Sequence, residues 1–216
     1  LKLASDTDAS GMPRAALALY QHVLDPAAAA VEVRERLRSP GADKSALEAA
    51  LLRLEEDSRS NTPISLLKLA GMASALEAMG DQRQACGLRE QVARDFPESP
   101  LNEENLLRLT RLRLGLAQVA ESEGKTDQAI TGYEKTWMEG KGGSAAQAAK
   151  RWMELVWDRN GKGDRLSACR GGLSFLEATK DSEAELSEEG RASRDEIQRL
   201  VRIFQASLAE KAGQEP

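Results

Sequence analysis

The stretch GKTDQAITGYEK (residues 124–135) contains the spacing from which the fold follows. Its glycine, Gly124, stands five residues before Ala129, and an aromatic residue, Tyr133, follows four residues later. A glycine can end one helix because it adopts a left-handed backbone conformation without steric penalty. An alanine in the first turns of the next helix is small enough for two antiparallel helices to approach closely. The stretch therefore predicts a helical hairpin with a tight turn.

The same glycine-to-alanine spacing occurs at five places, each between two segments that are expected to be helical. Successive glycines are 30, 39, 44 and 39 residues apart. A series of helix–turn–helix junctions at such intervals is the signature of a repeat architecture. The five pairs are Gly11/Ala16, Gly41/Ala46, Gly80/Ala85, Gly124/Ala129 and Gly163/Ala168.

The remainder of the chain is predicted to be helices joined by short loops. Asp25 and Pro26 supply an N-cap followed by proline at the first helical position, and Asp43 supplies another cap. No alternating apolar run bounded by turns predicts a strand, so we expect an all-α fold. The expected helices cover about residues 26–38, 43–57, 63–79, 81–95, 102–122, 126–139, 144–159, 164–179 and 187–211, after the end of one helix and a whole second helix in residues 1–24.

These junctions resemble the tetratricopeptide repeat, a family of 34-residue helical hairpins that stack into a right-handed superhelix. The most complete copy is LKLAGMASALEAMGDQRQACGLREQVARDFP (residues 67–97), where Met72 and Ala73 replace the family's leucine–small pair. The copy at residues 26–57 keeps little beyond its glycine and alanine, and Arg89 stands where the family prefers an aromatic residue. The resemblance covers about residues 1–182 and implies a superhelical solenoid of about five antiparallel hairpins.

The last expected helix differs from the others because it is apolar on one side only. A helix with one apolar stripe at the end of a repeat array is typical of a cap that separates the array from water. We therefore expect residues 183–216 to form a C-terminal capping helix and tail. The stripe consists of Ile197, Leu200, Val201, Phe204 and Leu208.

The two cysteines, Cys86 and Cys169, each follow the alanine of their hairpin directly. Helices pack roughly 8–10 Å apart, so two hairpins separate equivalent positions by on the order of 20 Å. A disulfide requires Cα atoms within about 7 Å. We expect two buried thiols that are not linked to each other, which favours a reducing compartment.

Composition and motifs exclude several classes of function. The formal net charge of −5 argues against a general nucleic-acid binder, and no apolar run approaches the ~20 residues that cross a membrane. His22 is the single histidine, which excludes multi-histidine metal sites and paired-histidine catalysis. No other motif for bond chemistry is visible. We expect no enzyme activity, no cofactor and no metal site.

The resemblance implies that the first helix of each hairpin lines a concave groove for a peptide or helix of a partner protein. This groove is expected to be mostly apolar, with Arg111 and Lys150 at one rim. Met153 and Trp157, one turn apart, are expected to anchor an apolar partner; the alternative is that they pack beneath the last helix or beneath a lengthened loop. The candidate partner-binding residues are Ala70, Ser74, Arg111, Leu114, Gln118, Lys150, Met153 and Trp157, with Val31, Glu35, Leu67, Glu77, Glu121 and Asn160 at corresponding positions.

The leading hypothesis is a non-enzymatic scaffold for protein–protein interaction. One alternative is the regulatory or substrate-positioning region of a larger enzyme whose catalytic part precedes Leu1, because the chain begins inside a repeat. Another is a self-assembly module that forms a homo-oligomer through this truncated repeat. The segment VARDFPESPLNEE (residues 92–104) is similar to repeat junctions of bacterial envelope lipoproteins and implies the periplasmic side of the cell envelope, whereas the buried thiols favour the cytoplasm.

Overall fold

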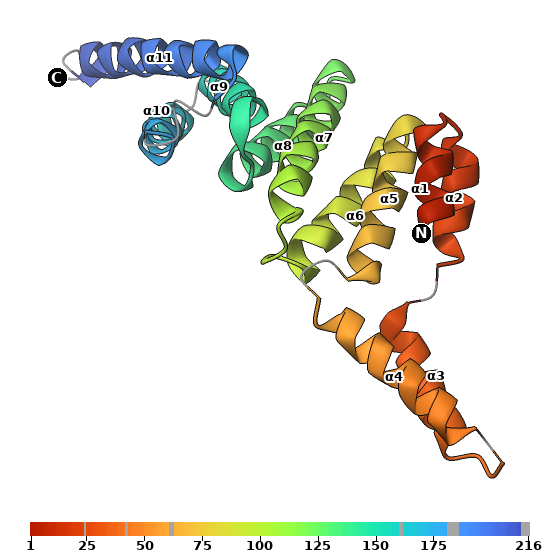
Figure 1. The fold of residues 1–216 in the computed structure, drawn as a ribbon. Helices are drawn as coiled ribbons and strands as arrows, with labels where there is room; N and C mark the ends of the chain where they lie inside the picture. Colours follow the sequence, from red (N-terminus) through yellow and green to blue (C-terminus); the bar gives the residue numbers. More distant parts are fainter. Residues whose placement is uncertain (24, 42, 61–62, 160–161, 181–185, 213–216) are drawn as a thin grey trace. The chain divides into compact units, whose positions relative to one another are not determined.

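The computed structural model describes residues 1–23, 25–41, 43–60, 63–159, 162–180 and 186–212 (Figure 1). Within these ranges every regular element is a helix and none is a strand, which confirms the predicted all-α class. The chain divides into two compact units, Leu1–Asn105 and Leu106–Pro216. The predicted domain boundary near residue 182 lies outside the described ranges.

Each predicted helix is present, with ends at most two residues from the predicted ones. The N-terminal unit contains α1 (Lys2–Ala9), α2 (Pro13–Gln21), α3 (Pro26–Leu37), α4 (Lys44–Ser58), α5 (Ile64–Ala78), α6 (Gln82–Asp95) and the first turn of α7 (Asn102–Ser122). The C-terminal unit contains the rest of α7, then α8 (Thr126–Glu139), α9 (Gly142–Asp158), α10 (Lys162–Ala178) and α11 (Glu188–Ala212). Both predicted caps are also confirmed: the side chain of Asp25 accepts from the Ala27 amide at 2.9 Å, and that of Asp43 accepts from the Ala46 amide at 3.2 Å.

Four of the five predicted turn glycines have the left-handed backbone conformation. The φ angles are 74° at Gly11, 87° at Gly41, 82° at Gly80 and 74° at Gly124. The prediction for Gly163 is wrong, because this residue lies in the first turn of α10 and not in a turn that ends α9. The sequence signal fails there because glycine followed by aspartate is as compatible with a helix start as with a turn.

The alanines that follow these glycines occupy the closest points between helices. Ala16, Ala85, Ala129 and Ala168 have no exposed surface. Ala46, in the second copy, is exposed. In this copy α3 and α4 pack chiefly on each other, and α2 packs directly on α5 (Figure 1). The expectation of five hairpins stacked in succession is therefore wrong at residues 26–58, where the two helices bury few side chains.

The inserted hairpin of α3 and α4 has little core of its own. Its buried residues are Pro26 and Ala30 on α3, while Val31 and Leu52 are 54% and 55% exposed. The side chains of Arg34 and Glu55 join the two helices by an ion pair of 2.8 Å. An exposed pair of this kind contributes at most about 1 kcal/mol.

The packing of α2 on α5 depends on a missing side chain. Tyr20 of α2 lies against Gly71 of α5, where an added Cβ would stand 2.2 Å from the ring Cζ.

In the same unit, Arg89 of α6 is only 3% exposed. Its guanidinium donates to Glu77, to the Asn105 amide oxygen at 3.2 Å and to the Ser74 hydroxyl at 3.3 Å. A buried cation requires such partners, and they allow arginine to replace the aromatic residue expected at this position.

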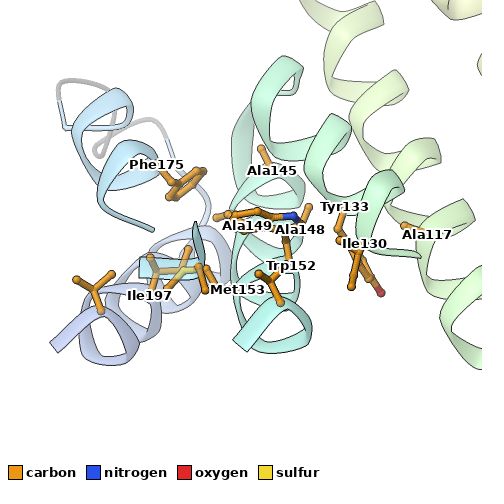
Figure 2. Close-up of a cluster of buried hydrophobic side chains, with 14 of the residues drawn as sticks. Ala117, Ile130, Tyr133, Ala145, Ala148, Ala149, Trp152, Met153, Phe175 and Ile197 are labelled. Atoms are coloured by element: carbon orange, nitrogen blue, oxygen red, sulfur yellow. The ribbon is translucent and has the colours of Figure 1, made fainter. Parts of the chain in front are cut away.

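The core of the C-terminal unit surrounds α9, which packs on α8, α10 and α11. Figure 2 shows this cluster, with alanines on one face of α9 and Trp152 and Met153 further along the helix. The predicted apolar stripe of α11 is confirmed, since Ile197, Val201 and Phe204 are buried against the cluster. The start of α11 approaches α9 closely, because a Cβ on Gly190 would stand 2.9 Å from the Gly143 Cα.

The thiols of Cys86 and Cys169 are buried, and neither forms a disulfide, as predicted. Burial raises the pKa of the Cys169 thiol, so this side chain serves as a small hydrophobic residue at neutral pH.

We expect Phe204→Ala to destabilise the C-terminal unit strongly. The ring stacks on Trp157 with centroids 3.8 Å apart and planes 8° apart, and its loss leaves a cavity that costs about 3–5 kcal/mol. The control is Ile203→Ala, one residue earlier and 53% exposed, for which we expect a change within about 0.5 kcal/mol. Tryptophan fluorescence during urea denaturation reports this unit, because Trp137, Trp152 and Trp157 all lie in it. Equal effects of the two variants would contradict the docking of α11.

Candidate functional site

Four of the residues predicted for the groove line one pocket of about 320 Å³ in the C-terminal unit: Leu114, Gln118, Glu121 and Lys150. Spacings of three and four residues place the contributions of α7 and α9 on one face of each helix. We call this site the α7–α9 pocket. Its lining consists of Leu114, Gln118, Glu121, Tyr133, Gln147, Lys150, Arg151, Glu154 and Ser193.

A network of hydrogen bonds centred on Glu121 forms the inner part of the α7–α9 pocket. The Arg151 guanidinium donates to Glu121 Oε1 through Nε at 2.9 Å and also through Nη2. The Tyr133 hydroxyl donates to Glu121 Oε2 at 2.6 Å. Arg151 Nη1 donates to Glu154 Oε2 at 2.6 Å. Both oxygens of the Glu121 carboxylate therefore have partners within the protein.

These contacts fix the charges in the pocket at neutral pH. The hydrogen bond from Arg151 is the main reason why the pKa of Glu121 is lowered, and burial opposes it. Burial, followed by the hydrogen bond to Glu121, raises the pKa of Tyr133. The hydrogen bonds to Glu121 and then to Glu154 raise the pKa of Arg151. The carboxylate and the guanidinium are therefore charged, and the phenol is neutral.

Helix α11 contributes one side of the pocket and pairs with the lysine. Ser193 of α11 is part of the lining, and Lys150 Nζ lies 3.4 Å from Glu196 Oε2 of the same helix. Gln118 is exposed and Gln147 is half-buried, so these two amides face an entering ligand. The lining carries two acidic and two basic side chains and is balanced in charge.

The predicted anchors Met153 and Trp157 do not face this pocket. Met153 is 1% exposed within the core cluster. Trp157 stacks on Phe204, and the Arg165 guanidinium lies 5.1 Å from the ring centroid of Trp157. The expectation that Met153 lies open to a partner is therefore wrong, and Trp157 is half-buried against Phe204 of α11, in agreement with the alternative that these side chains pack beneath the last helix. The apolar stripe of α11 covers them because it needs an apolar surface of its own.

The other predicted residues are not among the residues that line the α7–α9 pocket. Ala70 and Ser74 belong to α5 of the N-terminal unit, where Ser74 accepts a hydrogen bond from Arg89. Arg111 is exposed on α7. Asn160 lies outside the described residues. The prediction that these residues contact a partner stays a prediction.

Several lining residues were not among the candidate residues. On α9, Gln147 and Glu154 stand three residues before and four residues after Lys150, and Arg151 stands four residues after Gln147. Helical periodicity applied to this face would therefore have identified them. The quoted stretch predicts Tyr133 as an aromatic residue of the core, but it does not predict that the Tyr133 hydroxyl takes part in the pocket. Ser193 carries no sequence signal, because its place depends on how α11 packs on α9.

The chain matches no protein-family model, no curated protein sequence and no solved structure. Among the described residues, no three or more histidine, cysteine or acidic side chains gather as metal ligands would. In the same ranges, each helix is too short or too polar to traverse a lipid bilayer.

We expect Glu121→Gln to destabilise the C-terminal unit in a pH-dependent manner. The pKa of Glu121 is lowered by folding, so its contribution is present above its unfolded value of about 4.3 and is lost as the pH falls through the folded pKa. The variant should unfold about 1–2 kcal/mol more easily at pH 7 and match the parent at low pH. Urea denaturation followed by tryptophan fluorescence at several pH values measures this difference.

The control for this variant is Glu177→Gln in the same unit. Glu177 is exposed on α10, so its loss should change stability by less than about 0.5 kcal/mol. A deficit in Glu121→Gln that stayed constant down to pH 3 would show that the ionised carboxylate is not the stabilising group.

Proposed function

We propose that this chain is a protein–protein interaction scaffold that binds an extended peptide segment of a partner at the α7–α9 pocket. The observation that carries the proposal is the chemistry of the lining. Each charged side chain of the lining has an ionic partner, Glu196 of α11 in the case of Lys150, and the lining also holds Gln118, which is exposed, and Gln147, which is half-buried. A peptide can pair with these amides without displacing an internal ion pair.

The size and charge of the pocket favour this class of ligand. A volume of about 320 Å³ lies at the lower end of the range of ligand pockets, which is about 300–1,000 Å³. It has room for a side chain and the peptide groups next to it. A balanced lining does not attract phosphate groups or nucleic acid, which require an excess of basic side chains.

The helical hairpins support the same proposal. Left-handed glycines and buried alanines recur at the spacing that the sequence shares with tetratricopeptide repeats. Leu114, Gln118 and Lys150, which the resemblance assigns to a peptide groove, lie in the α7–α9 pocket. We therefore propose a tetratricopeptide-like scaffold interrupted by the inserted hairpin of α3 and α4.

Selection of peptides from a random phage-displayed library on the purified chain tests this function. We expect enriched peptides to bind the parent, and Gln118→Arg to weaken binding at least tenfold, because the longer cation fills the opening and disturbs the charge balance. The matched control is Gln128→Arg, which introduces the same side chain at an exposed position of α8 outside the pocket. It should bind like the parent.

Both variants must first show the parent's helical circular dichroism spectrum and melting temperature. Failure to enrich any peptide, or equal binding by Gln118→Arg and Gln128→Arg, would show that the α7–α9 pocket is not a peptide site.

A further inference from the structure

A second pocket of about 320 Å³ lies in the N-terminal unit, between α2, α5 and α6. We call it the α2–α6 pocket. Among the described residues that line it, four have apolar side chains, three are glutamines and none is charged. The lining consists of Leu17, Gln21, Met72, Leu76, Gln84, Gly87, Leu88 and Gln91.

The packing of the described residues does not explain why residue 87 is a glycine. It lies within helix α6, where glycine is less favourable than alanine. Other helical glycines are required by close neighbours: a Cβ on Gly71 would stand 2.2 Å from the Tyr20 ring, and one on Gly171 would stand 2.2 Å from the Trp152 ring. A Cβ on Gly87 would meet nothing within 4 Å, and the backbone there is not left-handed. The missing side chain instead leaves the α6 backbone open to a ligand in the pocket.

The floor of the α2–α6 pocket suits one apolar side chain. Leu76 is 5% exposed, and Leu17, Met72 and Leu88 are half-buried around it. An aliphatic group that enters this space is removed from water on several sides, which is favourable in proportion to the apolar area covered.

The rim of the pocket suits peptide groups. Gln21 and Gln84 are exposed and Gln91 is half-buried. Each amide side chain offers both a donor and an acceptor, as a peptide group does. The Gln84 amide nitrogen donates to Asp81 Oδ2 at 2.6 Å, so Gln84 offers its carbonyl oxygen. With no charge in the lining, a charged ligand would lose hydration without gaining an ionic partner.

We propose that the α2–α6 pocket binds an uncharged peptide segment of a partner protein, with one aliphatic side chain on the apolar floor and the peptide backbone against Gly87 and the glutamines. Its lining shares no residue with that of the α7–α9 pocket and, among the described residues, carries no charged side chain. This assignment does not depend on the function proposed for the C-terminal unit.

N-acetyl-leucinamide is the probe for this site, because it carries one aliphatic side chain between two peptide groups and no charge. We expect it to shift the ¹³C-methyl resonance of Met72 in the full chain, saturably, with a dissociation constant on the order of millimolar for so small a ligand. The resonance is assigned with Met72→Leu. N-acetylaspartamide, which is negatively charged at neutral pH, should produce no saturable shift.

Gly87→Leu separates binding from stability. The new side chain points into open space, so the melting temperature should stay the same or rise while affinity for N-acetyl-leucinamide falls at least tenfold. Gln82→Leu is the matched control, because it adds leucine at an exposed position of α6 outside the lining, and it should bind as the parent does. Gln21→Leu, at an exposed position of α2, should weaken binding at least threefold with an unchanged melting temperature.

Three results would overturn the proposal. The first is the absence of a saturable Met72 shift up to the solubility limit of N-acetyl-leucinamide. The second is equal affinity in Gly87→Leu and the parent. The third is equal binding of N-acetylaspartamide, which would refute selection for an uncharged ligand. If Gly87→Leu melts at a lower temperature, Gln21→Leu decides, and parent-like affinity in that variant would count against the site.

Discussion

The structure depends on the close contact between the two helices of three hairpins, α1–α2, α5–α6 and α7–α8. A glycine with positive φ reverses the chain, and five residues later an alanine without exposed surface lies against the preceding helix, as at Ala16, Ala85 and Ala129. Protein interiors are too dense to accept a larger side chain at such a point without moving a helix. The contact therefore sets the distance between the helices and determines which side chains reach the next element.

In these hairpins the residue nine positions after the turn glycine interacts with a carboxylate that stands three positions before the same glycine. Burial and then Asp8 raise the pKa of Tyr20, Glu77 pairs with Arg89, and Glu121 accepts from Tyr133. In the C-terminal unit Arg151 joins the third of these pairs and extends it into the α7–α9 pocket. The site is thus an extension of a pair that the hairpin geometry places in the same way each time. These pairs are Asp8/Tyr20, Glu77/Arg89 and Glu121/Tyr133.

Local signals predicted the helices and most of the turns, because caps, glycines and buried alanines act within a few residues of chain. Contacts between distant segments were predicted less well. Two apolar residues one helical turn apart, such as Met153 and Trp157, indicate that another element packs on them. Their spacing does not show whether this element is α11 or a partner protein. The hairpin of α3 and α4 keeps the glycine and alanine of a repeat, and its position outside the stack became visible only from the contact of α2 with α5. Ser193 of the candidate site depends wholly on how α11 packs.

The direct contact of α2 with α5 also gives the inserted hairpin a particular place in the chain. The Lys68 ammonium group donates to the Val23 carbonyl oxygen at 2.7 Å, so the chain leaves α2 and re-enters at α5 close to the same point. Helices α2 and α5, which lie outside residues 26–58, thus hold the two ends of this segment close together. The conformational entropy that is lost when the ends of such a segment are joined grows only slowly with its length. The hairpin should consequently tolerate the insertion, loss or exchange of residues without a change in the interface between α2 and α5.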